Sequence, residues 1–104
     1  MKADPAMAMI SLASKAGKVK SGEFSVEKAI ENGKARLVIV AKDASFATKK
    51  SYRDHCGFYG VKCCEYSDKE NLGYMIGKDY RAAIAVCDDN FARGIAGRIK
   101  ESAW

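Results

Sequence analysis

Apolar residues along this chain follow two alternating patterns, one typical of amphipathic helices and one typical of short buried strands. Apolar positions at helical spacing, framed by capping residues, predict helices over 5–17, 21–33 and 45–57, after Ser67 or Asp68, and from Asp88 onward. Short apolar runs predict strands over 36–41, 61–66 and 81–87, with 18–20 as a short strand or an extended link. This alternation predicts an α/β fold, a three-layer α/β/α sandwich with a small mixed four-stranded sheet.

The segment from Gly22 to Ser45 is the clearest of these units, a helix, a turn, a strand and a second turn. A glycine leads into the helix, whose N-terminal amide groups can hold an anion. The run Leu37–Ala41 is rich in β-branched residues, as expected of a buried strand. Lys42 and Asp43 follow at its carboxyl end, where open α/β sheets usually place binding residues. The segment therefore predicts a ligand-binding end of the sheet.

The composition indicates one domain, 1–104, with a modest core, because the 104 residues are 48% hydrophobic and 30% charged. No apolar run approaches the roughly 18 residues that a membrane span needs, so we expect no membrane segment. The N-terminal residues lack the apolar core of a signal peptide, and we expect the protein in the cytoplasm. We also expect it to act as a monomer.

Positive charge is concentrated in the first part of the chain. Of the formal net charge of +5, residues 1–42 carry +4 and residues 43–104 carry +1. The basic residues of the first part include Lys15, Lys18, Lys20, Lys28, Lys34, Arg36 and Lys42. A local basic surface favours phosphate-bearing partners, because binding releases counterions. Charge alone is equally consistent with a solvated, slightly basic surface.

No pattern of catalytic residues stands out. His55 is the single histidine, and its neighbour Cys56 points in another direction on a helix, so the two do not form a dyad. Asp88 and Asp89 stand where acidic residues complement a helix dipole, which explains them better than a metal site does. Dinucleotide-binding, P-loop and zinc-protease motifs are absent. We therefore expect no enzyme, no catalytic residue and no cofactor.

The cysteines do not form a metal-binding pattern. Cys56, Cys63, Cys64 and Cys87 include no Cys-x-x-Cys pair, and their spacing is wrong for a structural zinc site. Cys63 and Cys64 are adjacent in a predicted strand, so their side chains should point to opposite faces. We expect reduced, mostly buried thiols and no bound metal.

A candidate anion-binding site lies at the start of the second predicted helix. Gly22 lets a backbone or a phosphate approach closely. Lys28 shares a helix face with Phe24 and Ser25 and can add charge there. The alternative is that Gly22 is only a turn residue and Lys28 only a solvated side chain. From these residues alone, both interpretations stay open.

Several segments in order along the chain resemble the kink-turn RNA-binding ribosomal-protein superfamily, which includes large-subunit ribosomal proteins and box C/D small nucleolar core proteins. The matching segments are 10–18, 21–23, 28–30, 33–45, 56–61, 71–78 and 85–92. The resemblance covers almost the whole chain, and it is greatest to the small bacterial YlxQ-like branch, often encoded among translation and transcription factors.

The resemblance implies the three-layer fold and recognition of a sharply bent RNA helix with an internal loop. In the family, the start of the second helix contacts tandem sheared G·A pairs, and a loop before the last strand packs on an extruded base. Carried over by position, the helix contacts fall on Gly22, Glu23, Phe24, Ser25 and Lys28. The loop contacts fall on Lys78, Asp79 and Tyr80, with Arg81 adjoining.

The chain departs from the family pattern at the position that reads guanine. Strong kink-turn binders carry an amide–carboxylate pair such as Asn-Glu, or Lys-Gln in some bacterial members, where this chain has Phe24-Ser25. Loss of a bidentate base contact costs about 1–3 kcal/mol of discrimination. The loop also carries a lysine, an aspartate and a tyrosine in place of short apolar residues, and Phe24 or Tyr80 could stack on unpaired bases instead.

The leading hypothesis is a non-enzymatic RNA-binding protein of altered or relaxed specificity, linked to the ribosome or to RNA processing. In this hypothesis Gly22 admits the RNA backbone, Phe24 and Tyr80 stack, and lysines hold phosphates. Those lysines are Lys18, Lys20, Lys28, Lys34 and Lys42. The alternative is a protein-interaction module on the same fold, with Phe24 and Tyr80 as exposed anchors.

Overall fold

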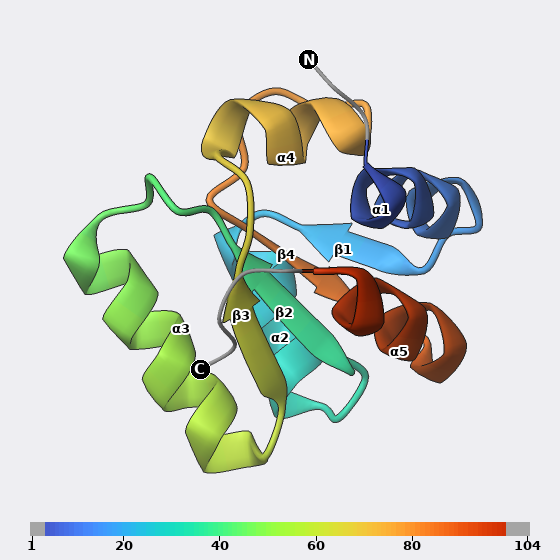
Figure 1. Ribbon diagram of the computed structural model, residues 1–104. Coiled ribbons are helices and arrows are strands. Elements are labelled where there is room, and N and C mark those ends of the chain that lie inside the picture. The colour runs from blue at the N-terminus through green and yellow to red at the C-terminus, as the bar shows by residue number, and fades with distance from the viewer. Residues whose placement is uncertain (1–3, 100–104) are drawn as a thin grey trace.

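Helices and strands alternate along residues 4–99, which are the residues that the computed structural model describes. The sheet has the strand order β1-β4-β2-β3 (Figure 1). Strands β2 and β3 run parallel, and the β1–β4 and β2–β4 pairings are antiparallel. The strands are β1 (Val19–Ser21), β2 (Leu37–Val40), β3 (Lys62–Glu65) and β4 (Ala83–Val86). The predicted mixed four-stranded sheet is confirmed.

Helices cover both faces of the sheet. The helices are α1 (Pro5–Lys15), α2 (Glu23–Glu31), α3 (Phe46–Tyr59), α4 (Lys69–Met75) and α5 (Asp89–Arg98). One core cluster joins α1, α4 and α5 to one face, and a second joins α2 and α3 to the other. Figure 1 shows α2 behind the sheet and α5 in front of it. The predicted three-layer α/β/α sandwich is confirmed.

Side chains alternate strictly between the two cores. Leu37 and Ile39 enter the cluster with α1 and α5, whereas Val38 and Val40 enter the cluster with α2 and α3. All residues of β2 are buried, which explains why this strand is a continuous apolar run. In β3, Cys64 lies in the first cluster and Cys63 in the second. The predicted opposite orientation of these two thiols is confirmed.

Short polar side chains cap the predicted helix starts. Asp4, Ser45, Asp68 and Asp88 each accept a hydrogen bond from the backbone N–H three residues later, at 2.8–3.1 Å. Gly22 precedes α2 without any side-chain cap. Among the five helices of residues 4–99, α2 is therefore the helix whose first-turn amides donate to no capping side chain.

The structure corrects two details of the third predicted helix. It runs past 57 to Tyr59, because the residue that adopts the left-handed conformation and ends it is Gly60, with φ of 71°. The sequence pattern of this helix predicts Phe46 on its apolar side, but the Phe46 side chain is 76% exposed, and the buried side is formed by Tyr52 and Cys56. The pattern of the last helix predicts Lys100 on its outer face, and this residue lies outside the described residues. No helix within residues 4–99 has both the length and the apolar character that a membrane span requires.

Candidate functional site

The start of α2 and the loop before β4 meet at one end of the strands, beside the end of β1. Ser21 at the end of β1 pairs with Ile84 in β4, so the first turn of α2 lies beside the loop 77–82. The Arg81 Nε atom donates to the Ser21 hydroxyl at 3.2 Å, and Arg81 Nη1 donates to the Tyr80 carbonyl at 2.9 Å. The two segments that the family resemblance indicated are therefore tied together in this fold.

A hollow of about 250 Å³ opens between these segments. It is lined by Gly22, Glu23, Thr48, Tyr52, Tyr80, Arg81, Ala82 and Ala83. Thr48 and Tyr52 come from α3 and were not predicted as site residues. Their helical spacing in the sequence showed only that they share a helix face, and the packing of α3 against α2 brings that face to the hollow.

The loop before β4 is fixed against α4. The Lys78 N–H donates to the Gly73 carbonyl at 2.9 Å. A Cβ atom at Gly73 would lie 1.8 Å from the carbonyl oxygen of Asp79, so a larger residue would force the loop away from the helix. Lys78, Asp79 and Tyr80 are exposed on this loop. No local sequence pattern indicates that Gly73 positions the loop, because the contact joins α4 to a loop outside that helix.

Gly22 occupies a backbone conformation that favours glycine, with φ of 90° and ψ of 143°. A Cβ at Gly22 would meet no atom within 4 Å, so the conformation and not the space around it requires glycine. The amides of the first turn of α2 have no partner within the helix. Together with the helix dipole, they favour an anion at this end of the helix.

Two aromatic side chains project from this end of the strands. Phe24 is 74% exposed and Tyr80 is 66% exposed. The Lys28 ammonium lies 5.7 Å from the centroid of the Phe24 ring, so the predicted shared face of these two residues is confirmed. A stacking partner and a positive charge therefore lie next to each other on α2.

A second hollow, of about 190 Å³, lies on the flank of α2 that faces β1. We call its basic residues Lys20, Lys28 and Lys34 the lysine flank. Its lining is completed by Ser25, Ala29, Asn32 and Cys87. Within residues 4–99, none of the lysine-flank side chains forms an ion pair. Their charges are therefore available to an anion.

The positive charges near the lysine flank act on the pKa of the Cys87 thiol. Burial raises the pKa of Cys87, while Lys20, Lys34 and Arg36 act in the opposite direction. These cations thus surround one half-buried thiol at the end of β4. Arg36 was in the basic part of the sequence, yet only the fold shows that it adjoins the lysine flank.

The opposite side of α2 is acidic. Burial, together with the negative charges of Glu23 and Glu27, raises the pKa of Tyr52 to about 12. Glu23, Glu27 and Tyr52 also line a shallow hollow between α2 and α3. A polyanion is therefore repelled on the α3 side of α2 and can approach the helix from the lysine flank.

The remaining predicted lysines lie at opposite ends of the sheet. Lys18 stands at the start of β1, where its carbonyl accepts the Cys87 N–H at 2.7 Å, so it adjoins the lysine flank. Lys42 follows β2 and is exposed; its neighbour Ala41 donates its N–H to Ala82 at 2.8 Å, which places Lys42 at the Tyr80 end of the strands. The fold therefore groups the predicted basic residues around α2 but does not gather them at one point.

Cys56, Cys63 and His55 are engaged in structural contacts. Contact with the Cys56 thiol and burial raise the pKa of Cys63, and both residues pack in the core beneath α3. His55 Nε2 lies 3.2 Å from a carboxylate oxygen of Glu31, which joins α3 to α2. Among residues 4–99, no group of three or more side chains of the metal-binding types is placed to hold an ion.

These features define an α/β/α protein with a glycine-led helix start, the exposed rings of Phe24 and Tyr80 beside it, and a flank of lysines without ion pairs among residues 4–99. The sequence pattern of one family matches residues 5–95, and its description is the ribosomal protein L7Ae/L30e/S12e/Gadd45 family. The chain belongs to this family.

Similar proteins come from bacteria and archaea. The chain is 42% identical over 84 residues to the RNA-binding protein YlxQ of Bacillus subtilis (strain 168), an alignment that covers 81% of this chain and 84% of that protein. It is 41% identical over 88 residues to the RNA-binding protein YlxQ of Enterococcus faecium, covering 85% and 84%. These relatives confirm the predicted YlxQ-like branch. The large ribosomal subunit protein eL8 of Cenarchaeum symbiosum (strain A) is more distant, at 29% identity over 100 residues, with 95% and 79% covered.

A solved structure has the same fold. A Bacillus halodurans protein, whose structure is described as that of a protein with unknown function, superposes with a TM-score of 0.90 at 36% sequence identity. The match covers 95% of this chain and 100% of that one. The arrangement of α2, the loop before β4 and the sheet between them therefore has a counterpart in another protein.

Proposed function

We propose that this protein binds RNA at the edge formed by the start of α2 and the loop before β4. The observation that carries the proposal is the convergence of an uncapped helix start, the exposed rings of Phe24 and Tyr80, and the lysine flank on one side of the molecule. Relatives at 41 and 42% identity are named as RNA-binding proteins, and the more distant relative as a ribosomal protein, which supports this choice of ligand.

Each element of the site has a distinct task in the proposal. Amides of the first turn of α2 bind a backbone phosphate beside Gly22. Phe24 and Tyr80 stack on unpaired bases of a kink-turn or another internal loop. The lysine flank then neutralises phosphates of the adjoining helix. Glu27, which lines the hollow between α2 and α3, keeps the RNA off the α3 side and so fixes the direction of approach, while Glu23 stays among the contact residues at the start of α2.

The proposed specificity is relaxed, and the setting is the ribosome or RNA processing. Phe24 and Ser25 provide no bidentate contact to a guanine edge, while the elements that hold phosphate are all present. The protein should therefore prefer bent or looped RNA over a continuous duplex, with weak dependence on the identity of the bases.

The test is the substitution Lys28→Ala with Lys15→Ala as its matched control. Lys15 is an exposed lysine in the last turn of α1, so its loss changes the net charge equally on another layer of the fold. Lys28→Ala should weaken binding of a kink-turn RNA and lower the slope of log affinity against log salt by about 1. An unchanged slope, or equal effects of the two substitutions, would remove α2 from the binding surface.

The exposure of Phe24 and Tyr80 also favours a second candidate, a surface for a protein partner. The two candidates differ in nuclease sensitivity. Association through RNA is lost from a cell extract after ribonuclease treatment, whereas a direct protein contact survives it.

A further inference from the structure

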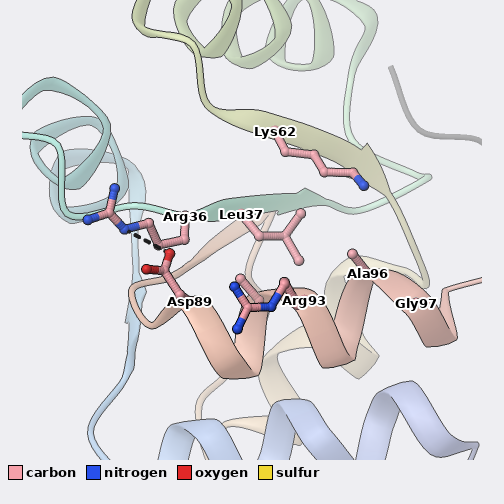
Figure 2. Close-up of a pocket in the computed structure, with 8 residues that line it drawn as sticks. Arg36, Leu37, Lys62, Asp89, Arg93, Ala96 and Gly97 are labelled. Atoms are coloured by element: carbon pink, nitrogen blue, oxygen red, sulfur yellow. Dashed lines mark ion pairs between the residues drawn. The ribbon is translucent and has the colours of Figure 1, made fainter.

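A hollow of about 440 Å³ lies at the opposite end of the strands from Gly22 and Tyr80. It separates α5 from the first residues of β2 and β3 (Figure 2). Small residues of α5, Ala96 and Gly97 among them, leave room beneath Lys62, which Figure 2 shows extending from β3 into this space. None of the residues that the family resemblance indicated as RNA contacts lines this hollow.

Positive charge dominates the walls of the hollow. Arg36, Lys62 and Arg93 line it, with Asp89 as the one acidic lining residue. Lys62 forms no ion pair within the part of the chain that the structure describes, and Arg93 donates to the neutral Asn90 side chain at 2.8 Å.

Arg36 is only partly neutralised. Its Nε atom lies 3.2 Å from a carboxylate oxygen of Asp89, and the side chains are 51% and 66% exposed. Figure 2 shows the other two guanidinium nitrogens turned away from Asp89. These two nitrogens can donate to a phosphate while the Asp89 contact holds the guanidinium in place.

Arg36 also connects this hollow to the lysine flank. It lines the hollow, and it acts with Lys20 and Lys34 on the Cys87 thiol, so it is near both. The cations therefore continue from α2 around the sheet edge to α5. We call this set the basic track: Lys20, Lys28, Lys34, Arg36, Lys62 and Arg93.

We propose that the hollow between α5 and the β2–β3 edge is a second RNA-contact site, which binds backbone phosphates of a strand that continues from the α2 site. This inference rests on the proposed function, because the α2 site supplies the RNA whose extension the basic track holds. A repeating phosphate chain fits a series of cations spread across several elements, and guanidinium groups bind phosphate oxygens in pairs. The small apolar residues Ala92, Ala96 and Gly97 leave space in which the sugars of the RNA backbone can contact the protein.

The test compares two double variants of equal charge change. Lys62→Gln with Arg93→Gln removes two cations of the track. Lys15→Gln with Arg98→Gln is the control, because both of these exposed residues lie away from the track and Arg98 caps a carbonyl within α5. The probes are a kink-turn RNA with long flanking stems, the same RNA with trimmed stems, an unstructured uridine-rich RNA, and polyglutamate.

The track variant should bind the long-stem RNA with a salt slope lower by about 1.4–1.8, since two phosphate contacts are lost. Between about 50 and 200 mM salt, the intact protein then loses about tenfold more affinity than the variant. The control variant should match the intact protein, and trimmed stems should abolish the difference.

The outcomes separate the two proposals. If Lys28→Ala weakens binding and the track variant leaves the slope unchanged, the second site is overturned and the proposed function stands. If the intact protein binds only the uridine-rich RNA and the track variant flattens that slope, the kink-turn preference fails and the track remains. Failure to bind any RNA overturns both. Equal sensitivity of polyglutamate binding to the track variant overturns RNA as the occupant.

Discussion

Under the proposed function, a base-reading pair placed at the start of α2 should turn relaxed RNA binding into specific kink-turn recognition. The double substitution Phe24→Asn with Ser25→Glu places an amide and a carboxylate on the first turn of α2, beside the Gly22 end of the helix. In the family these groups contact the sheared G·A pairs, and the fold already presents the two positions on the exposed surface.

The expected gain comes from the missing base contact. One good bidentate contact contributes about 1–3 kcal/mol of discrimination, which corresponds to a preference larger by about 5- to 150-fold. The substitution also removes the contact between Lys28 and the Phe24 ring, which is worth about 0.5–1 kcal/mol at an exposed site. That loss is the same whichever RNA is bound, so it does not reduce the discrimination, which should rise by the full base contact.

The fold should tolerate the change. Phe24 is 74% exposed, so its replacement should cost no more than the Lys28 contact, about 0.5–1 kcal/mol. A glutamate in the first turn of α2 also complements the helix dipole. The melting temperature of the variant should therefore stay close to that of the parent protein.

The assay is a competition between a kink-turn RNA and the same RNA with Watson–Crick pairs in place of the sheared pairs. Phe24→Ala with Ser25→Ala serves as the control, because it removes the ring without adding base-reading groups. The reasoning is refuted if the folded Asn-Glu variant discriminates no better than the parent protein, since the departure at Phe24-Ser25 would then not limit specificity.

Two further predictions concern the supports of the site. Gly73→Ala should displace the loop before β4, since a Cβ would meet the Asp79 carbonyl at 1.8 Å, and should cost about 1–3 kcal/mol in a urea titration. Gly57→Ala, in the exposed part of α3 where a Cβ meets nothing within 4 Å, should instead stabilise the protein by about 0.5–1 kcal/mol, and a similar loss for both would contradict the role of Gly73. Tyr52, with its pKa raised to about 12 by burial and by Glu23 and Glu27, should stay protonated in the folded state when an unfolded tyrosine ionises near pH 10. Its contribution to stability is therefore complete below pH 10 and is lost as the pH rises from 10 to 12; an absorbance titration with a Tyr52→Phe control measures this, and ionisation near pH 10 would contradict it.

Local patterns were sufficient to predict the alternation of elements. Leu37–Val40 could be recognised as a doubly buried strand because every residue is apolar, and both sheet cores receive its side chains in turn. Capping residues such as Asp4 and Ser45 marked helix starts through bonds that join residues three apart. The end of α3 was placed too early because Gly57 and Gly60 both suit a helix terminus, and only Gly60 takes the left-handed conformation.

The arrangement of the site depended on contacts between distant segments. The hydrogen bond from Arg81 to Ser21 and the contact of Gly73 with Asp79 follow from strand pairing and helix packing, which no local pattern encodes. The same holds for the basic track, since Arg36 and Arg93 come from different elements and meet only across the β2–α5 hollow. The resemblance to a family indicated the proposed site at the start of α2, whereas the proposed basic track follows only from the fold.

Crosslinking in cells, followed by sequencing of the attached RNA and identification of the attached peptide, tests the central claim most directly. The account predicts recovery of a structured RNA joined to the peptides that contain Phe24 or Tyr80, the two exposed rings at that end of the strands. Recovery of no RNA would contradict it. Recovery of RNA joined only to peptides of α1, which lies on the other face of the sheet from α2, would also contradict it.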